Sequence, residues 1–584
     1  MLADSTVPED NPSSQFLVQH HAPSRLAAHD ASLFGFSAEV AEYAANFLGW
    51  TTLASEPPHD PQDIDSFARE VREEGLDTVV LIGQGGSTQA SMTITRLNAL
   101  SRDEVMFRTM DSLSPVYVHR ILTQSDPNHT LYLVSSKSGT TIEPTMLSRL
   151  AWTDVCARIG VDEAPSRFVA ITDPGTALDR RAQEQNWRKV FHGAPDVGGR
   201  YSALSVFGLV PAALVGFDIE AMLAGAAVEE RRCSADSLSN PAVRLASFLY
   251  ENYKEGRDKF SLVTPQPGRV FGLWVEQLVA ESLGKWGHGI LPNIEVDPSL
   301  LCVPHDDRSV ITYNIRPDEE SRRQMAYVDP SIPRLTLELR QVDEIARDFV
   351  IWEYAIAMVG LLMEVNPFDQ PDVASTKEAF KGILYGGLKP SEPVQLDNDV
   401  QATFTKSLIN TGSGETPQTL DDALELLLRA IGPGDYFSIN AFLPFTGEGR
   451  RMPLEQMRHV IADRFAVASC LEIGPRYLHS TGQFQKGGPN EGVFLLLSAN
   501  EPNDITIPQE DFTLGQMERA QAEGDMHVLC ERNRRALHLH LRDNTGETLT
   551  ELSKHIYMVA RKVSEERNGI RRGSSRFGNS FSNF

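Results

Sequence analysis

Short, unbroken apolar runs alternate with helix-like segments through the middle of the chain. Three such runs occupy residues 77–83 (DTVVLIG), 129–135 (HTLYLVS) and 167–172 (RFVAIT). A strand that is apolar at every position is buried on both faces, as in a parallel sheet covered by helices. The alternation therefore predicts an α/β fold built on a doubly wound parallel sheet.

A second set of strand-like runs follows and predicts a second domain of the same kind. These runs lie at 259–264, 289–296, 308–315 and 334–340, and a long apolar helix then ends at Asn366-Pro367. Helical and strand patterns over residues 420–550 predict a smaller C-terminal α/β unit.

The expected division of the 584 residues has six parts. They are a polar, Pro-rich and disordered arm at 1–30, a first α/β domain at 31–235, a second at 236–395, a linker at 396–419, a C-terminal α/β unit at 420–550, and a helix end with a mobile basic tail at 551–584.

The net charge is strongly negative, because 54 Lys and Arg residues face 79 Asp and Glu residues, which gives −25. An acidic surface repels polyanions, so nucleic-acid binding and docking on anionic membranes are not expected. The five cysteines are widely spaced and form no CxxC motif, as expected for reduced thiols in the cytoplasm. No signal peptide is recognisable, and the uncharged stretch at 201–217 is interpreted as a buried helix.

The loop after the strand at 129–135 has the composition of a phosphate-binding loop. It reads SSKSGTTIEP and contains Ser136, Lys137, Ser138 and Thr141 before a predicted helix. Hydroxyls, backbone N–H groups and the positive end of a helix dipole all favour a phosphate monoester. The alternative is a Ser/Thr-rich turn that only caps the helix.

The loop after the strand at 77–83 is rich in glycine and reads GQGGST, with Gly86 and Ser87 at its end. It lacks the third glycine of a dinucleotide fingerprint and the Lys of a P-loop. It is either a tight turn or a second ligand-binding loop. If both loops bind a ligand, they should meet at the carboxyl edge of one sheet.

Two further segments carry charged side chains with catalytic potential. Arg200 follows two glycines in VGGRYS and could stabilise an oxyanion, or could pair with a structural carboxylate. Glu281 lies in ESLGK on an apolar helix and could act as a general base. Alternatively, Glu281 and Lys285 form an ordinary i,i+4 pair on a solvated face.

The remaining candidates lie on loops towards the C-terminal half. Gln370 and Lys377 occur in NPFDQPDVASTK, where a new helix begins and a cleft could receive both side chains. His479 lies in the polar, glycine-rich stretch GPRYLHSTGQFQKGGP. A His in such a loop can transfer protons near neutral pH.

In this order, the segments IGQGGS, SSKSGTTIEP, VGGRYS, ESLGK and NPFDQPDVASTK resemble the phosphoglucose isomerase family over about residues 75–380. RLAAHDASLFGF and GPRYLHSTGQFQKGGPNEGVFL resemble the isomerase half of bifunctional transaldolase/phosphoglucose isomerases. About 75 residues precede the first strand of the sheet, too few for a transaldolase barrel, so a stand-alone isomerase is expected. The resemblance implies two sugar isomerase (SIS) domains and a homodimer.

The resemblance also implies residue roles. Ser136, Lys137, Ser138 and Thr141 match the phosphate loop, with Gly86 and Ser87 nearby. Glu281 matches the base that moves a proton between C2 and C1, and Arg200 the cation beside the enediol oxygen. Gln370 matches a sugar-contacting Gln, and Lys377 the Lys that assists at the ring oxygen.

Two positions depart from the family pattern. Leu283 replaces the Asn of ESNGK, and the GTNGQH segment with the ring-opening His is missing between Glu281 and Lys377. His479 is the preferred substitute, and His305, in VPHDDRSV, lacks a matching context. If neither serves, the enzyme would rely on the open-chain sugar or on Lys377.

The resulting hypothesis is a metal-free isomerase of glucose 6-phosphate and fructose 6-phosphate, without a cofactor. The alternatives are a non-catalytic sugar-phosphate sensor and an SIS isomerase of another phosphosugar. Glu281 distinguishes the isomerase from the sensor, because a sensor needs no base beside Arg200 and Lys377.

Overall fold

The computed structural model describes residues 2–98, 105–264, 268–295, 297–315, 326–339, 344–397, 399–445, 447 and 449–571. The chain forms two compact units. Unit 1 comprises Met1–Pro390, Ile473–Asn490 and Glu501–Val528, and unit 2 comprises Ser391–Glu472, Glu491–Asn500 and Leu529–Phe584. The predicted boundary between residues 235 and 236 stays a prediction.

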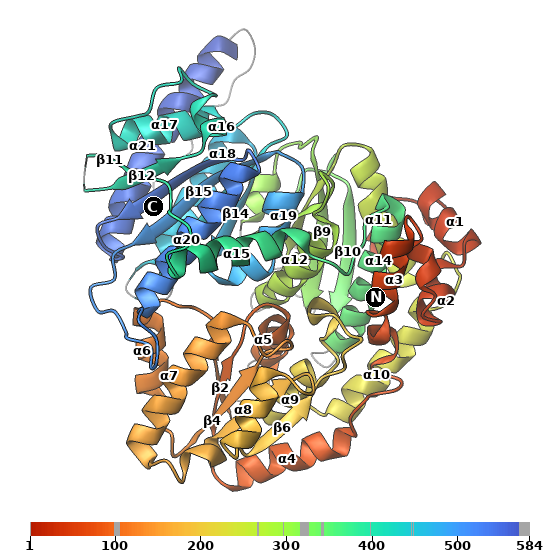
Figure 1. The fold of residues 1–584 in the computed structure, drawn as a ribbon. Coiled ribbons are helices and arrows are strands. Elements are labelled where there is room, and N and C mark those ends of the chain that lie inside the picture. Colours follow the sequence, from red (N-terminus) through yellow and green to blue (C-terminus); the bar gives the residue numbers. More distant parts are fainter. Residues whose placement is uncertain are drawn as a thin grey trace. The chain divides into compact units, whose positions relative to one another are not determined.

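The first sheet of unit 1 is parallel throughout, with strand order β3-β2-β4-β5-β6 (Figure 1). Its strands are β2 Thr78–Ile82, β3 Met106–Met110, β4 Thr130–Ser135, β5 Phe168–Thr172 and β6 Lys189–His192. Its surrounding helices are α4 Pro61–Glu73, α5 Gly86–Asn98, α6 Pro115–Gln124, α7 Ile142–Ile159, α8 Ala177–Glu184, α9 Val206–Leu214 and α10 Ile219–Cys233.

Both faces of this sheet are buried, as the unbroken apolar strands predict. Val79 and Leu81 of β2 belong to one hydrophobic cluster, while Val80 and Ile82 belong to another. Successive side chains of a strand point to opposite faces, so each face packs against its own layer of helices. The two strands that the sequence did not indicate, β3 and β6, form the edges of the sheet, where polar side chains interrupt the apolar pattern.

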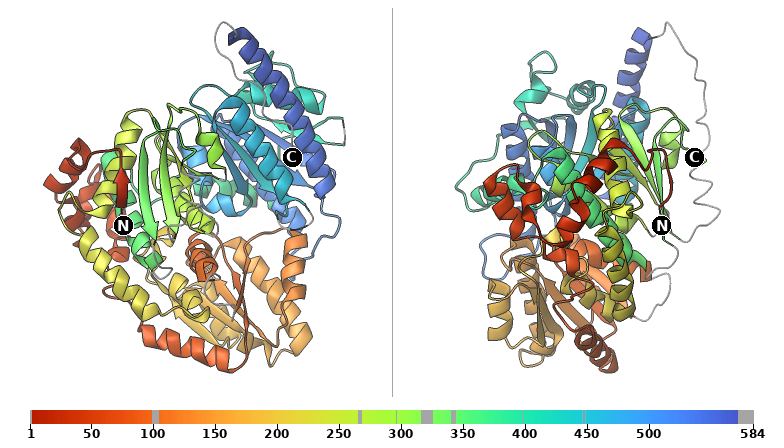
Figure 2. Two further views of the ribbon diagram at one scale, coloured as in Figure 1. Left: turned by 180° about the vertical axis from the view of Figure 1, so that it is seen from behind. Right: turned by 90° about the vertical axis from the view of Figure 1, so that its right-hand side faces the viewer.

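The second sheet of unit 1 has the order β1-β10-β9-β7-β8 and is parallel except for β1, which runs antiparallel to β10 (Figure 2). Its strands are β1 Leu2–Ser5, β7 Lys259–Val263, β8 Leu291–Glu295, β9 Arg308–Ile315 and β10 Arg334–Leu339. The accompanying helices are α11 Pro241–Lys254, α12 Arg269–Leu283, α14 Ile345–Met363 and α15 Pro371–Leu384. The prediction of two parallel α/β sheets is confirmed.

The prediction of a disordered arm at 1–30 is wrong for most of that segment. It forms β1, α1 Pro12–Gln19 and α2 Ala22–Ala27, with η1 Ala31–Phe34, α3 Ala38–Ala45 and η2 Gly49–Thr52 following. Asn11 caps α1, and Leu17 and Leu26 are buried in the main core. Tertiary contacts, including that of Ser13 with Glu251, compensate for the polar composition.

Unit 2 contains a mixed sheet with the order β11-β12-β16-β15-β13-β14. Its strands are β11 Val394–Gln395, β12 Gln401–Phe404, β13 Tyr436–Phe442, β14 Ala468–Ile473, β15 Gly492–Ala499 and β16 Arg535–Leu541. Its helices are α16 Lys406–Ile409, α17 Leu420–Arg429, α18 Arg451–Phe465 and α21 Gly546–Arg571. The predicted C-terminal α/β unit is therefore present.

The predicted linker at 396–419 contains regular structure. β12 pairs antiparallel with β16, and the backbone N–H of buried Thr405 donates to the Ala536 carbonyl before α16 begins. Pairing with a central strand orders a segment whose polar composition predicted a linker. Residues 572–584 of the predicted mobile tail lie outside the described residues.

Three short elements belong to unit 1 although they follow the first strands of unit 2 in sequence. They are η7 Arg476–His479, α19 Gly482–Gly487 and the part of α20 (Leu514–Glu531) that precedes Leu529. The chain therefore leaves unit 2 twice and contributes to unit 1. Across the described ranges, no helix has both the length and the apolar composition of a membrane span. The uncharged stretch at 201–217 instead contributes the fully buried α9.

Candidate functional site

The two loops predicted to bind a ligand are neighbours at the carboxyl edge of the first sheet. The chain runs from β2 to the edge strand β3 and then returns to β4 on the other side of β2. This reversal of strand order is where open α/β sheets bind ligands. The Ser135 hydroxyl donates to the Ser87 carbonyl at 3.2 Å, and a Cβ on Gly83 would lie 2.8 Å from the Ser135 carbonyl oxygen. Glycine is required for this close approach.

The loop at 136–141 ends at the N-terminus of α7 and offers uncommitted hydroxyls. Thr141 occupies the N-cap position, yet its side chain makes no capping hydrogen bond. Ser136 is buried, and its hydroxyl has no hydrogen-bond partner among the described residues. Ser138 accepts a hydrogen bond from the Thr140 hydroxyl at 3.1 Å. A helix N-terminus with such hydroxyls is suited to an anion.

The side chain of Lys137 is directed to a structural partner. Its Nζ lies 2.5 Å from Asp173 Oδ2 and donates to the Ala194 carbonyl at 2.9 Å. Asp173 follows β5, so this ion pair fastens the loop after β4 to the neighbouring strand end. Because the amino group is committed, the main chain is the part of Lys137 left to contact a phosphate.

The glycines of the first loop bring Arg200 to the same edge. A Cβ on Gly86 would lie 2.1 Å from the carbonyl oxygen of Gly199, so the start of α5 packs directly on the backbone before Arg200. Gly199–Tyr201 forms a short 3₁₀ turn, η4, in which Arg200 is 5% exposed.

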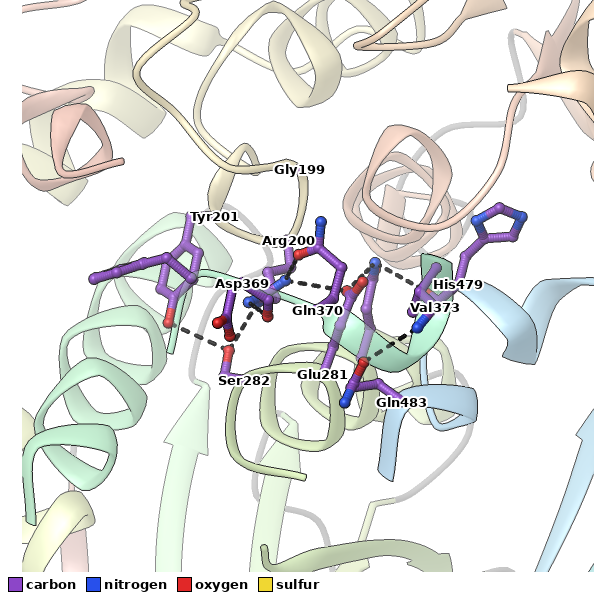
Figure 3. Close-up of polar contacts among 12 residues, drawn as sticks. Gly199, Arg200, Tyr201, Glu281, Ser282, Asp369, Gln370, Val373, His479 and Gln483 are labelled. Carbon is purple, nitrogen blue, oxygen red and sulfur yellow. Dashed lines mark hydrogen bonds and ion pairs between the residues drawn. The ribbon is translucent and has the colours of Figure 1, made fainter. Parts of the chain in front are cut away.

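The Arg200 guanidinium is held by four oxygen acceptors (Figure 3). Nε donates to Ser282 Oγ at 2.9 Å, and one terminal nitrogen donates to Gln370 Oε1 at 2.9 Å. The other donates to the carbonyl oxygens of Pro367 at 2.6 Å and Asp369 at 2.9 Å. This arrangement fixes the cation and leaves one N–H of the first terminal nitrogen for another oxygen.

Glu281 lies beside that nitrogen, in the last turn of α12. Its Oε2 is 3.6 Å from Arg200 Nη1, and its side chain is buried. Gln277, one turn earlier, donates from Nε2 both to Glu281 Oε2 at 3.2 Å and to the carbonyl of His479 at 3.0 Å. A carboxylate beside a fixed guanidinium can move a proton next to a developing oxyanion.

Lys285 does not form the solvated i,i+4 pair with Glu281 that the sequence left open. It is fully buried, and its Nζ donates to Asp369 Oδ1 at 2.6 Å and to the Asn366 carbonyl. Burial, together with the nearby charge of Arg200, lowers the pKa of Lys285 to about 7. Lys285 and Arg200 thus clamp the loop at 366–370 from two sides.

The clamped loop leads into α15, which carries Lys377. Gln370 occupies the N-cap position of α15 and turns its Oε1 to Arg200. Gln483 caps the helix instead, since its Oε1 accepts from the backbone N–H groups of Asp372 at 2.9 Å and Val373 at 3.3 Å. Its Nε2 donates to the Gly284 carbonyl at 3.0 Å, so the start of α15 is tied to the end of α12.

His479 belongs to unit 1 and not to the C-terminal unit in which the sequence placed it. Arg476 anchors the η7 turn through an ion pair of 2.8 Å with Asp111, and Tyr477 donates to Asp525 at 2.7 Å. The turn lies close to the first loop, because a Cβ on Gly85 would be 3.0 Å from His479 Cβ. The alternative histidine, His305, contacts the Leu300 carbonyl within its own loop.

One pocket joins the phosphate-type loop to the later candidates. It is lined by residues of the loop at 136–141 and of α7, α15, η7 and α20, namely Ser138, Thr140, Thr141, Ile142, Glu143, Val373, Thr376, Lys377, Phe380, Lys381, Leu478, His479 and Gln521. Gln277 connects His479, in the lining of this pocket, to Glu281, which lies beside Arg200. The fold therefore brings together candidates that lie as far apart in sequence as Ser138 and His479.

Glu143 is the main residue of the site that the sequence did not indicate. It is 4% exposed, and its Oε1 lies 3.1 Å from His479 Nε2. Burial alone would raise the pKa of Glu143, but the charge and hydrogen bond of His479, helped by Lys377, lower it below its ordinary value. The acidic residue within SSKSGTTIEP could have indicated Glu143 as a site residue. A carboxylate at that position is also explained by a contact with the helix dipole.

Two comparisons with known proteins agree on the family. A glucose-6-phosphate isomerase of Staphylococcus aureus is 30% identical over 392 residues, which cover 58% of this chain and 87% of that protein. The chain belongs to the phosphoglucose isomerase family. The family profile, described as phosphoglucose isomerase, matches residues 69–288, which include both loops, Arg200 and Glu281.

Solved structures show the same fold at lower sequence identity. A glucose-6-phosphate isomerase of Chlamydia trachomatis superposes with a TM-score of 0.55 at 20% identity, covering 66% of this chain and 88% of that one. A hypothetical protein of Thermus thermophilus superposes with a TM-score of 0.54 at 23% identity, covering 66% of this chain and 100% of that one. Within the described ranges, no cluster of three or more His, Cys, Asp or Glu could hold a metal ion.

Proposed function

We propose that this protein interconverts glucose 6-phosphate and fructose 6-phosphate. The arrangement that carries the proposal is Glu281 beside the fixed guanidinium of Arg200, at 3.6 Å. Gln277 links Glu281 to the carbonyl of His479. The side chain of His479 lines the pocket next to the phosphate-type loop. Membership of the phosphoglucose isomerase family supports a phosphosugar as the substrate.

The phosphate would lie at the N-terminus of α7. Ser136, Ser138 and Thr141 would donate from their hydroxyls, and Lys137 from its backbone N–H. At the start of α5, Gly86 would add its backbone N–H and Ser87 its hydroxyl, because the backbone N–H of Ser87 donates to the Gln84 carbonyl. Helix dipoles and neutral donors hold a phosphate without a large excess of cations, which is compatible with a net charge of −25.

Ring opening would use His479 and Lys377. With its Nε2–H donated to Glu143, the His479 ring would present Nδ1 as the base that takes the proton of the anomeric hydroxyl. The C1–O5 bond then breaks, C1 becomes the aldehyde carbon, and Lys377 protonates O5. His479 is suited to this role because Glu143 fixes the tautomer.

Isomerisation would then require a single base. Glu281 removes the proton from C2, and the electrons of that C–H bond form the C1–C2 double bond of a cis-enediolate. The remaining N–H of Arg200 stabilises the oxyanion, while Gln370, which accepts from Arg200, contacts the sugar. Glu281 returns the proton to C1, and a proton moves from O2 to O1, which gives the ketose.

The test is a coupled assay with fructose 6-phosphate on the wild type and on Glu281→Gln. The substitution keeps the shape of the side chain but removes the base, so turnover should fall by about 10³-fold or more. Binding of fructose 6-phosphate, measured by calorimetry, should change little because the phosphate loop is untouched. The assay should proceed without an added metal ion.

The matched control is Glu353→Gln on α14. Glu353 is a buried carboxylate whose pKa burial raises well above its ordinary value, and it lies outside the proposed site. This variant should retain wild-type turnover. Near-normal turnover of Glu281→Gln would contradict the assignment. A wild type that binds but never converts fructose 6-phosphate would indicate a sensor, and preference for another phosphosugar would indicate a different SIS isomerase.

The finer assignments follow from the family. We infer a homodimer, which light scattering on the purified protein would test, and a cytoplasmic location, which cell fractionation would test. Five free cysteines, two of them buried, are compatible with a reducing compartment.

A further inference from the structure

We propose that Gln521 is a positioning residue that orients the ring-opening His479 through Glu143. This inference rests on the proposed function and extends it to a side chain of α20, a helix that the sequence did not connect with the site. Gln521 contacts neither Arg200 nor Glu281 in the described contacts, so its effect should be confined to ring opening.

The geometry places two N–H donors on one carboxylate oxygen. Glu143 Oε1 accepts from Gln521 Nε2 at 2.7 Å and from His479 Nε2 at 3.1 Å. Gln521 is 1% exposed and Glu143 is 4% exposed, so neither contact competes with bulk water. A carboxylate held by a second donor has one orientation, and the imidazole that it contacts then has one orientation and one tautomer.

The orientation of the Gln521 amide follows from its partner. The lowered pKa of Glu143 keeps the carboxylate ionised and able only to accept, so the amide nitrogen must face it. The amide oxygen then points away, and it is buried without a hydrogen-bond partner among the described residues.

That unpaired oxygen is a cost of placing Gln521 here, which partly offsets the hydrogen bond that its amide nitrogen donates to Glu143. A buried polar atom without a partner costs free energy, and an apolar side chain of similar size would avoid the cost. Gln521 also lines the same pocket as Ser138, Lys377 and His479. A polar side chain that burial disfavours, donating to the partner of the ring-opening His, is what a positioning role requires.

The test measures the two chemical steps separately on Gln521→Leu and Gln521→Met. Exchange NMR on fructose 6-phosphate reports the interconversion of its anomers, which needs ring opening. Incorporation of solvent deuterium reports proton transfer at C1 and C2. We expect anomer interconversion to slow by about tenfold in both variants, with little change in KM, because general acid–base catalysis depends on a correctly placed group.

Two further readouts distinguish positioning from a structural role. The melting temperature of the variants should stay close to that of the wild type, because removal of the buried unpaired oxygen offsets the loss of the hydrogen bond to Glu143. Loss of a donor should raise the pKa of Glu143. Since the ionised carboxylate is needed, the acidic limb of the anomer-interconversion profile should move to higher pH.

A control on the same helix is Glu518→Gln. Glu518 is 3% exposed, burial raises its pKa well above the ordinary value, and it does not line the pocket. This variant should interconvert anomers at the wild-type rate.

Anomer interconversion at the wild-type rate in folded Gln521→Leu and Gln521→Met would overturn the inference, as would equal slowing in Glu518→Gln. Failure of the proposed function is distinguishable, because the wild type itself would then neither accelerate anomer interconversion above the uncatalysed rate nor incorporate deuterium. Glu281→Gln should lose deuterium incorporation and keep anomer interconversion.

Discussion

Two parts of unit 1 build the site in different ways. Residues 1–390 contribute strand-end loops and helix ends, and their charged groups are held by neighbouring charges and carbonyls, as Arg200 and Lys285 show. The two excursions, at 473–490 and 501–528, contribute polar side chains that reach the first part through hydrogen bonds, as Gln483 and Gln521 do. The first part carries the groups proposed for phosphate binding and for proton transfer between C1 and C2, and the second carries His479, which is proposed to open the ring together with Lys377 of the first part.

This difference indicates a division of labour. A frame of parallel strands fixes loops that are near each other in the sheet, so it can hold a base and a cation with little freedom. The two excursions approach the loop after β2 and the N-terminus of α7 from outside the sheets. They can therefore complete the site without altering the parallel strands. Substitutions in the two parts should therefore have separable effects.

The largest effect is expected for Arg200→Lys in the frame. A single ammonium cannot reach Ser282, Gln370 and the carbonyls of the 366–370 loop at once, and it would leave buried acceptors unpaired. We expect kcat/KM for fructose 6-phosphate to fall by about 10³-fold, together with a lower melting temperature. Arg188→Lys, at an ion pair with Glu70 and Glu74, should keep its activity. Activity of Arg200→Lys near the wild-type value would contradict the proposal that residues 1–390 hold the cation and the base in fixed positions.

A smaller effect, on both stability and rate, is expected for Gln483→Ala in the first excursion. The change leaves the N–H groups of Asp372 and Val373 and the Gly284 carbonyl without their partner. The free energy of unfolding should fall by about 2–4 kcal/mol, measured by denaturant titration. Turnover should fall as well, because α15 carries Lys377. The exposed Gln62→Ala on α4 should change stability by less than about 0.5 kcal/mol.

The smallest effect on substrate affinity is expected for Lys137→Met. The Lys137 amino group contacts Asp173 and the Ala194 carbonyl, so its loss should change the KM for fructose 6-phosphate by less than about threefold. Ser138→Ala, in the pocket lining, should raise KM by more. A larger rise in KM for Lys137→Met than for Ser138→Ala would show that the amino group turns to the phosphate when substrate binds.

The sequence predicted the frame better than the excursions. Unbroken apolar runs located β2, β4 and β5, and short motifs located Arg200, Glu281 and the phosphate-type loop. The edge strands β3 and β6 were not indicated, because edge positions tolerate polar side chains. Leu283, which departs from the family pattern, is fully buried, while its neighbour Ser282 supports Arg200.

The side-chain contacts of the candidate site show the same limit of prediction from sequence. The sequence by itself determined the parallel α/β frame and the residue types at its strand ends, because apolar periodicity and loop composition are local properties. Only the tertiary structure decided that Lys137 pairs with Asp173, that Lys285 holds Asp369, and that Glu143 receives both His479 and Gln521. Those contacts join residues up to 378 positions apart, and no local pattern specifies which distant partner a polar side chain meets in a buried, low-dielectric interior.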